Sequence, residues 1–466
     1  MKGISSWTYR PYKPFFFDCG DIYICRVVPT KNAVFFEWLG DGSGVYEVYY
    51  RKENDGEYIL AGKTDKNEYN ITGLPAETDY EFYVQSGDKK SRVRLARTGE
   101  GIGGVVVNYL HPRDEAYSFS GHCLCSPSMV RHPDGYLIAS MDLFAQKEPQ
   151  NLTLIFRSDD DGNTWHYVSE LMPCFWGKLF IHKGRLYMLS CSTEYGDLLI
   201  GASDDGGKTF CTPTVLMRGS GRSHKAGCHK SPENVVRYNG RLWETMEWGS
   251  WGEGYHAPMI MSIDENDDLL VAENWSFAPP IKYDPNWKGL PKGESSGCIE
   301  GALTVAPDGK LYNIMRYDML RLDPDRGLAI AFAVNTDDPE SPLRFDHTVP
   351  FMGNHSKFEI LFDEKSGYYY SIVSRIYDGG HAGARNLLSL IRSKDAYNWE
   401  NVADLIDRRD VDRLKIGFQY VEFIISGDDI LYLSRTAVNG CENFHNSNYI
   451  TFHRIKDFRK LEGNIG

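Results

Sequence analysis

Two runs of the sequence share the pattern S-x-D-x-G-x-T-[W/F]: Ser158-Asp159-Asp160-Asp161-Gly162-Asn163-Thr164-Trp165 and Ser203-Asp204-Asp205-Gly206-Gly207-Lys208-Thr209-Phe210. Each run follows an apolar stretch that is typical of a β-strand. In such a hairpin turn the Ser and Asp side chains bond nearby backbone amides, Gly takes a positive φ, and the aromatic residue returns to the core. Two copies of one turn predict a repeat fold.

A longer repeat surrounds these turns from residue 101 onward. Its unit is a strand, a turn, a second strand and a third strand, and it recurs about every 50 residues. Six of the turns between first and second strands can be recognised, at 132–137, 183–187, 239–243, 307–312, 365–369 and 427–432. We therefore predict an all-β chain with a six-bladed β-propeller over 101–463, seven blades being the alternative. Residues 104–109 are expected to close the ring as the outer strand of the last blade.

The stretch before the propeller has a different rhythm. Between residues 20 and 98, strand-like runs alternate with turns every 8–12 residues or so, which predicts a seven-strand β-sandwich. The predicted strands are 22–28, 33–38, 46–49, 58–61, 68–71, 79–85 and 91–96. This stretch resembles a fibronectin type III domain, and residues 1–19 form a separate N-terminal segment.

Composition limits the partners and the compartment. The chain of 466 residues is 42% hydrophobic and 25% charged, which predicts a folded globular protein. Its net charge of −13 opposes nucleic-acid binding, and no apolar run reaches the length of a membrane span, so we expect neither partner. Ten cysteines and an N-terminus without an apolar segment favour a cytoplasmic protein with reduced thiols. A signal sequence removed from the chain would indicate secretion instead.

The turns indicate which face of the propeller carries chemistry. If strands A to D are counted from the centre, the A–B turns and the S-x-D-x-G-x-T-[W/F] turns lie on one face. Antiparallel geometry then puts the starts of the A strands and the ends of the B strands on the other face. Three B strands end on Arg316, Arg375 and Arg435, whose converging guanidinium groups would bind a carboxylate. The alternative is a set of rim ion pairs with Asp318, Asp378 and Glu442.

Titratable side chains at the starts of A strands are candidate catalytic groups. His122 and His229 occupy matching positions in two blades and are candidates for proton transfer. Glu233 and Glu300 are candidates for the acid and the base of a hydrolase. The alternatives are structural histidines, and inward glutamates that bond only water or one another.

Further candidates flank these positions. Tyr317 and Tyr377, which follow two of the arginines, are assigned to catalysis. Substrate binding is assigned, besides the arginines, to Lys230, Glu247, Trp248, Trp251, Gln419 and His445. The two tryptophans would form an aromatic platform for a sugar, plain loop packing being the alternative. The His and Cys spacings match no metal-ligand pattern, so we assign no metal site and require no cofactor, and calcium in the central channel stays an open alternative.

Residues 101–463 resemble the sialidase superfamily, in which turns of the S-x-D-x-G-x-T-[W/F] type are known as Asp-boxes or BNR repeats. The resemblance implies an exo-acting enzyme. Exo-sialidases bind the sugar carboxylate with three Arg and use a Tyr–Glu nucleophile pair and an Asp acid. Their first Arg lies in an F-R-I-P motif, where this chain has Leu124-Cys125-Ser126-Pro127. The Cys in place of Arg argues against true sialidase activity and for another acidic or neutral sugar.

The sequence is also similar to β-propeller polysaccharide lyases, some of which release rhamnose from a glucuronate. The similarity lies in 126–130, 139–144, 417–420 and 448–454. It implies a carbohydrate-active enzyme that cleaves the terminal sugar of an acidic, uronate-containing oligosaccharide by β-elimination. The arginines would then neutralise the uronate, and His122 or His229 would take the C5 proton. A sialidase-like exo-glycoside hydrolase and a non-enzymatic glycan-binding propeller are the alternatives.

Overall fold

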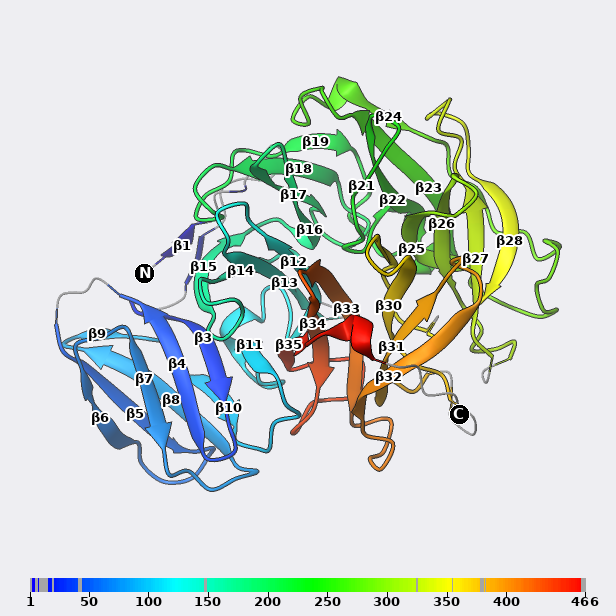
Figure 1. The fold of residues 1–466 in the computed structure, drawn as a ribbon. Coiled ribbons are helices and arrows are strands. Elements are labelled where there is room, and N and C mark those ends of the chain that lie inside the picture. The colour runs from blue at the N-terminus through cyan, green and yellow to red at the C-terminus, as the bar shows by residue number, and fades with distance from the viewer. Residues whose placement is uncertain are drawn as a thin grey trace.

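The computed structural model describes residues 2–4, 7, 16–18, 21–40, 44–145, 149–323, 326–353, 355–377, 381 and 383–461. Regular structure in this part of the chain is almost entirely β-strand, which confirms the predicted all-β class. The exceptions are the short 3₁₀ turns η1 (Glu115–Tyr117), η2 (Trp251–Glu253), η3 (Ala272–Asn274) and η4 (Phe458–Lys460). Within the same residues, no helix has the length and apolar character needed to cross a membrane. Figure 1 shows a small blue sandwich beside a larger body whose sheets succeed one another around a centre.

The N-terminal segment contains one short pair of strands. β1 (Lys2–Ile4) is antiparallel to β2 (Phe16–Asp18). Between them, Trp7 is completely buried, and its ring lies 5.7 Å from the ring of Phe210, edge to face. This contact fastens the segment to the larger body, at the aromatic residue that ends the second S-x-D-x-G-x-T-[W/F] turn.

The sandwich consists of two sheets. One contains β3 (Tyr23–Pro29), β4 (Ala33–Leu39) and β7 (Glu68–Thr72), and the other contains β10 (Arg94–Arg97), β8 (Asp79–Ser86), β5 (Tyr46–Lys52) and β6 (Ile59–Thr64), with β9 (Lys89–Lys90) beside β8. All seven strands predicted from the sequence are therefore present. They form because alternate residues such as Val34, Phe36 and Trp38 are buried between the sheets.

Six sheets make up the larger body in the described residues. In the first five sheets, strands follow in chain order from the centre outward. The first sheet contains β12 (Cys123–Arg131), β13 (Leu137–Phe144), β14 (Thr153–Ser158) and β15 (His166–Leu171), and the second contains β16 (Phe175–His182), β17 (Arg185–Cys191), β18 (Leu198–Ser203) and β19 (Thr214–Met217). The third contains β20 (Gly227–His229) and β21 (Val236–Tyr238), both beside β22 (Arg241–Ser250), and then β23 (Tyr255–Asp264) and β24 (Trp275–Phe277); the fourth contains β25 (Cys298–Val305), β26 (Leu311–Tyr317), β27 (Leu328–Ala333) and β28 (Arg344–Pro350); the fifth contains β29 (Leu361–Asp363), β30 (Tyr368–Ser374), β31 (Leu387–Ser393) and β32 (Trp399–Asp407).

The sixth sheet joins the two ends of the propeller. It contains β33 (Gly417–Ser426), β34 (Asp429–Ala437) and β35 (Tyr449–Ile455), and its outer strand is β11 (Val105–Tyr109), which pairs antiparallel with β35. The predicted closure by residues 104–109 is confirmed. Since β12 of the first sheet also contacts β33 of the last, the ring has no break between them.

The S-x-D-x-G-x-T-[W/F] turns have the predicted chemistry. Ser158 Oγ accepts a hydrogen bond from the Gly162 N–H at 2.8 Å, and Asp160 Oδ1 accepts one from the Thr164 N–H at 2.8 Å. Gly162 has a φ of +91°, and Trp165 is completely buried. The second run repeats both bonds. These turns join the two outer strands of a sheet, so they lie on the face opposite to the one that the sequence predicts to carry the catalytic groups.

Four inner strands begin with an irregularity. In β12, β16, β25 and β33 the pairing with the next strand shifts its register, and at each shift a non-glycine residue takes a positive φ. These residues are Ser126 (φ 46°), Trp176 (φ 53°), Glu300 (φ 55°) and Tyr420 (φ 51°). A bulge of this kind bends the strand and gives a side chain a new direction, at a cost in backbone strain.

Buried charges gather where the inner strands meet. We call this group the channel cluster; it consists of Lys178, Lys230, Lys357, Glu233, Glu244, Glu359 and Glu422. Lys178 Nζ lies 2.5 Å from Glu422, and Lys357 Nζ lies 3.1 Å from Glu359. Lys178 lies on β16 and Glu422 on β33, so their ion pair connects two blades through the centre.

Candidate active site

A cavity of about 500 Å³ opens at the starts of the inner strands, on the predicted face. We call it the site cavity. Its lining consists of Phe144, Gln150, Trp176, Glu194, Ser223, His229, Trp251, Ile299, Glu300, Arg316, Arg385, Tyr420, Arg435 and His445. Three of these residues, Trp176, Glu300 and Tyr420, are the positive-φ residues of inner-strand bulges. The strained backbone therefore supplies part of the lining.

A tyrosine and a glutamate form the closest polar contact in the site cavity. The Tyr420 hydroxyl donates to Glu300 Oε1 at 2.5 Å, and Arg316 Nη1 donates to Glu300 Oε2 at 2.7 Å. The same Arg316 nitrogen lies 3.4 Å from the Tyr420 oxygen. The carboxylate therefore holds the phenol and one guanidinium group in a fixed relation.

The electrostatics of this pair suit proton transfer from phenol to carboxylate. Burial raises the pKa of Glu300, but the charge of Arg316 and the hydrogen bonds from Tyr420 and Arg316 outweigh it, so that pKa lies below its usual range. Burial, and then the charge of Glu300, raise the pKa of Tyr420 to about 12. Glu300 is thus ionised and Tyr420 protonated near neutral pH, which is the resting state of a nucleophile with its base.

Arg385 and Arg435 bring the number of guanidinium groups in the cavity lining to three. Arg385 Nη2 donates to the His355 carbonyl at 2.9 Å, and Arg435 Nη2 donates to the His445 carbonyl at 2.6 Å. Among the described residues, Arg385 Nε and Nη1 and Arg435 Nε are buried without a hydrogen-bond partner. Burial, and then the charge of Arg316, lower the pKa of Arg385 to about 9. Buried cationic donors without hydrogen-bond partners lower the stability of the fold unless an anion binds to them.

Glu194 is a second carboxyl group of the cavity. Gln150 Nε2 donates to Glu194 Oε2 at 3.4 Å. Burial raises the pKa of Glu194, although the charge of His229 acts in the other direction. The pKa values of Glu194 and Glu300 are therefore displaced in opposite directions, which is the arrangement of a general acid and a base.

Glu247 connects two cavity residues from behind. Its Oε2 lies 2.7 Å from His229 Nδ1, and its Oε1 accepts the backbone N–H of Glu300 at 2.8 Å. The His229 ring also packs against Trp176 and His256, with ring centroids 4.3 and 4.6 Å apart. One buried carboxyl group thus positions the imidazole and the strained backbone of Glu300.

The structure brings several of the residues proposed from the sequence together. Those that line the site cavity are His229, Trp251, Glu300, Arg316, Arg435 and His445. Glu247 and Gln419 support them: Gln419 Nε2 donates to the carbonyls of Phe444 and His445 at 2.7 and 3.2 Å. Trp251 is 52% exposed, so it lies at the mouth of the cavity.

Arg375 does not join the other two arginines. Its Nη2 is 2.9 Å from both carboxylate oxygens of Asp404 on β32, and its Nε donates to Ser389 on β31. These outer strands hold the guanidinium group away from the site cavity. Of the proposed rim partners, Asp318 accepts from Ser296, Glu442 accepts from Asn446, and Asp378 lies outside the described residues.

Three aromatic residues proposed from the sequence lie outside the cavity lining. The Tyr317 hydroxyl is 2.8 Å from that of Tyr283, inside a hydrophobic cluster between sheets. The Tyr377 hydroxyl donates to Asn386 Oδ1 at 3.3 Å. Trp248 packs against the hydrophobic cluster of the second and third sheets, as the loop-packing alternative proposed.

The remaining residues proposed from the sequence occupy two other places. Lys230 and Glu233 belong to the channel cluster, where Lys230 Nζ lies 2.8 Å from Glu244. Burial raises the pKa of Glu233 well above its ordinary value. His122 lies in a separate groove beside the site cavity, with Nδ1 3.3 Å from the Asp114 carbonyl.

Sequence reasoning missed Tyr420, Arg385 and Glu194. Tyr420 follows Gln419 at the start of an inner strand, and the Tyr–Glu pair that the sialidase resemblance implies was a signal for it. Arg385 stands before β31 rather than at the end of a second strand, so the positional argument could not find it. Glu194 lies in a loop without any motif.

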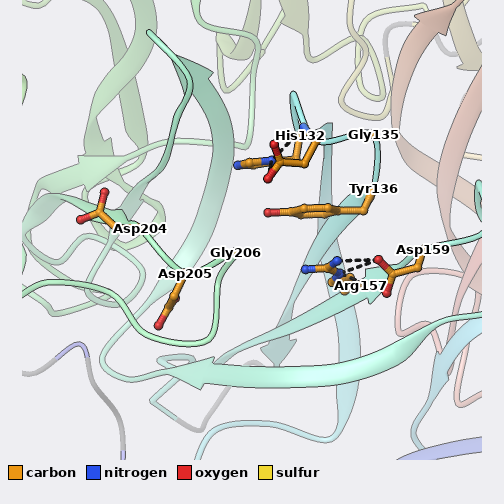
Figure 2. Close-up of a pocket in the computed structure, with 9 residues that line it drawn as sticks. His132, Gly135, Tyr136, Arg157, Asp159, Asp204, Asp205 and Gly206 are labelled. Atoms are coloured by element: carbon orange, nitrogen blue, oxygen red, sulfur yellow. Dashed lines mark hydrogen bonds and ion pairs between the residues drawn. The ribbon is translucent and has the colours of Figure 1, made fainter.

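Another hollow lies on the opposite face, between the turns of the first and second sheets (Figure 2). Its arginine, Arg157, lies 3.6 Å from the centre of the Tyr136 ring and donates to Asp159 at 2.9 Å. Asp204 pairs with Arg185, and Asp205 accepts from Thr209 inside its own turn. Because these charged groups are already partnered, this hollow is the weaker candidate for a site.

The described residues contain no group of three or more His, Cys, Asp or Glu side chains arranged to hold a metal ion. Around the centre of the ring, Glu244, Glu359 and Glu422 of the channel cluster form ion pairs with lysine ammonium groups. The nine cysteines in the described ranges form no disulfide with one another.

Comparisons with known proteins identify the fold. No protein-family model matches the chain, and no curated protein matches it either. Among solved structures, an α-L-arabinanase of Penicillium chrysogenum complexed with arabinobiose is similar at 13% identity, over 77% of this chain and 98% of that one, with a TM-score of 0.51. An α-L-arabinofuranosidase of Fusarium graminearum is similar at 13% identity, over 78% and 99%, with a TM-score of 0.51.

A Hadza microbial sialidase is also similar, at 13% identity, over 94% of this chain and 96% of that one, with a TM-score of 0.48. The fold of this chain is the all-β propeller that it shares with the arabinanase and the arabinofuranosidase. At such identities the likeness describes the fold and assigns no substrate to this chain.

Proposed function

We propose that this protein is an exo-acting glycoside hydrolase that removes a terminal sugar bearing a carboxylate. The observation that carries the proposal is the Tyr420 hydroxyl, held by Glu300 at 2.5 Å beside three guanidinium groups. A phenol with an adjacent ionised base is an activated nucleophile. Glycosidases with a tyrosine nucleophile are an established exception to the two-carboxylate rule.

The charge balance of the site cavity supports an anionic substrate. Its three guanidinium groups face one ionised carboxylate, Glu300, because the raised pKa of Glu194 favours its neutral form. The buried donors of Arg385 and Arg435 that lack partners would be satisfied by a substrate carboxylate. A neutral sugar would leave them unsatisfied.

The reaction follows from these groups. The Tyr420 oxygen attacks the anomeric carbon while Glu300 accepts the phenolic proton, and the bond from the anomeric carbon to the leaving oxygen breaks. Glu194 gives its proton to that oxygen. In the second half, Glu194 takes a proton from water, the water oxygen bonds to the anomeric carbon, and the tyrosine leaves and regains its proton from Glu300. The net change is the addition of one water across the glycosidic bond.

β-Elimination is the second candidate, and one feature favours it: His229 and Tyr420 line the same cavity as the arginines. Such groups could remove a C5 proton from a uronate whose charge the arginines neutralise. The two reactions differ in their products. Hydrolysis adds water to the summed products, whereas elimination adds none and creates an unsaturated uronate.

The test is incubation with a panel of oligosaccharides capped by uronates or sialates, with matched neutral-capped controls. Mass spectrometry should detect released acidic monosaccharide with the mass of one added water. Ultraviolet absorbance from an unsaturated uronate would decide for elimination. Cleavage of the neutral-capped controls at equal rates would contradict the anionic substrate.

Tyr420→Phe removes the nucleophilic oxygen and keeps the ring. We expect kcat to fall by about 10³-fold or more, with the melting temperature unchanged within a few degrees. Tyr377→Phe is the matched control, because its hydroxyl bonds to Asn386 outside the cavity, and it should keep wild-type activity. Wild-type activity in Tyr420→Phe would reject the nucleophile assignment.

A further inference from the structure

A groove of about 890 Å³ adjoins the site cavity. The two hollows share Phe144 and His445, whose rings pack edge to face with centroids 5.3 Å apart. The groove therefore begins where the cavity ends, on the same face of the propeller. A substrate that enters the cavity with its terminal sugar can continue into the groove.

The outer wall of the groove is the segment between β11 and β12, which includes Pro112, Arg113 and Glu115. Arg113 of this segment is 58% exposed in its side chain, and it forms an ion pair with Glu53 and a 3.3 Å contact with Asp79, both in the sandwich. The sandwich therefore holds this wall in place. That arrangement gives the N-terminal domain a connection with the substrate face.

The chemistry of the groove differs from that of the cavity. Two aromatic rings, Phe144 and Phe444, and the amides of Asn443 and Asn446 line it, and sugars use both kinds of contact. Its charged groups are Glu115 and Glu442, which are exposed carboxylates, and Arg113, which is already paired. The groove thus lacks the cationic excess of the cavity, and a second acidic sugar would meet carboxylates there.

We propose that this groove binds the neutral sugar units on the leaving-group side of the scissile bond. The inference rests on the proposed function and adds a substrate class: an oligosaccharide with one terminal carboxylate sugar followed by neutral sugars. Binding energy gathered along the groove would be used at the reacting bond. Longer substrates would then be cleaved with higher kcat/KM.

The experiment uses oligosaccharides that share one carboxylate-bearing terminal sugar and carry one, two or three neutral sugars behind it. For the wild-type protein we expect kcat/KM to rise by about tenfold from the shortest to the longest member. In Glu115→Trp, where an indole fills the groove, the increase should vanish while the shortest substrate is cleaved as before. An acidic sugar in the second position should lower kcat/KM.

A second variant tests the wall without touching the groove. Glu53→Ala removes the carboxylate that holds Arg113, and it should reduce the length dependence by at least half. Glu100→Ala is its control, because Glu100 belongs to an exposed pair with Lys31 elsewhere, and it should change nothing. Trp251→Ala probes the exposed tryptophan at the mouth of the cavity. If this variant lost the length dependence and Glu115→Trp kept it, the proposal would be overturned.

The two proposals fail in different ways. Cleavage of every acidic substrate at one rate, regardless of length, rejects the groove and leaves the hydrolase standing. If no acidic substrate is cleaved, the hydrolase is rejected, and the groove is then tested by calorimetry with the neutral trisaccharide and the wild-type protein. Binding that disappears in Glu115→Trp would support the groove; no binding would reject it.

Discussion

The propeller contains two groups of buried charge, the channel cluster and the site cavity, and they are balanced differently. In the channel cluster each lysine faces at least one carboxylate, as Lys178 faces Glu359 and Glu422 at 3.2 and 2.5 Å. In the site cavity Glu300 forms an ion pair with Arg316, and donors of Arg385 and Arg435 have no partner among the described residues. The three arginines lie on or next to β26, β31 and β34, whereas Lys178 and Glu422 of the channel cluster lie on the inner strands β16 and β33.

This difference in charge pairing indicates that the channel cluster serves stability and the site cavity serves function. A buried charge is tolerated when its partner belongs to the same chain, and each lysine of the channel cluster has such a partner. A buried charge whose partner is absent from the chain costs stability, and such a cost persists where it serves binding or catalysis. The balanced group should therefore control folding, and the unbalanced group should control activity.

Breaking the balanced group should have the largest effect. Lys357→Met leaves Glu359 and Glu422 with Lys178 alone, and we expect the free energy of unfolding to fall by about 3–5 kcal/mol. At present burial raises the pKa of Glu359, but Lys178 and Lys357 outweigh it and lower that pKa to about 2. That contribution exists above the ordinary glutamate pKa and is lost as pH falls, so the difference from wild type should shrink in acid.

Denaturant titrations at several pH values measure this difference. Lys365→Met is the matched control, because Lys365 and Asp428 form a pair that is 66% and 70% exposed, and its loss should be undetectable. Equal stability of Lys357→Met and wild type at neutral pH would contradict a structural role for the channel cluster.

The acid of the site cavity offers the next largest effect. Glu194→Gln cannot give a proton to the leaving oxygen, and we expect kcat to fall by about 10³-fold for substrates with a poor leaving group. In the wild type, activity needs Glu300 ionised and Glu194 protonated. Activity should therefore fall as pH drops through the lowered pKa of Glu300, and fall again as pH rises through the raised pKa of Glu194.

A pH profile of kcat/KM separates these roles. Glu194→Gln should lose the first alkaline decline and keep the acid one, and an activated leaving group should restore most of its rate. A profile identical to that of the wild type would remove Glu194 from the reaction. Above about pH 9 a second decline is expected in both proteins, because Arg385 loses its charge there.

Removing an unpartnered charge should lower activity and raise stability together. Arg385→Met keeps the length of the side chain and deletes the cation, so we expect kcat/KM for carboxylate substrates to fall by about 10²-fold. The melting temperature should rise, because a buried cation without a counter-ion among the described residues is gone. Kinetics and thermal unfolding of one preparation measure both effects, and a lower melting temperature would contradict the comparison between the two groups.

The fold could be read from the sequence because it depends on local turn chemistry. The hydrogen bonds of Ser158 and Asp160, and the burial of Trp165, follow from the residues of one turn. The pairing of β11 with β35 joins distant parts of the chain, yet it too was predictable, because a missing outer strand leaves an unpaired edge. Each of these inferences needs only spacing and residue type.

The site was only partly predictable, because it depends on backbone irregularities. Arg316 and Arg435 end regular second strands, so counting from the turns found them. The same counting put Arg375 beside them, but side-chain partners on β31 and β32 decide where that guanidinium group lies. Tyr420 lies in the cavity because of a positive-φ bulge, and nothing in the local sequence predicts that bulge.

Glu247 contacts both the His229 ring and the backbone of the Glu300 bulge, and its variants should have the smallest effect on activity. Glu247→Gln keeps an oxygen for the Glu300 N–H and an amide for His229 Nδ1, so the bulge that presents Glu300 stays in place while one charge is lost. We expect kcat to fall by about tenfold with KM nearly unchanged. Glu247→Ala removes both contacts, which frees the strained backbone of Glu300, and it should lower kcat further.

Steady-state kinetics tests whether Glu247→Gln loses less kcat than Glu247→Ala. A positioning role requires that Gln retain most of the activity that Ala loses, and that the loss lie in kcat rather than in KM. If both variants raised KM equally and left kcat alone, Glu247 would instead bind substrate, as the sequence led us to expect. Since Glu247 is buried behind His229 and absent from the cavity lining, its two hydrogen bonds favour positioning.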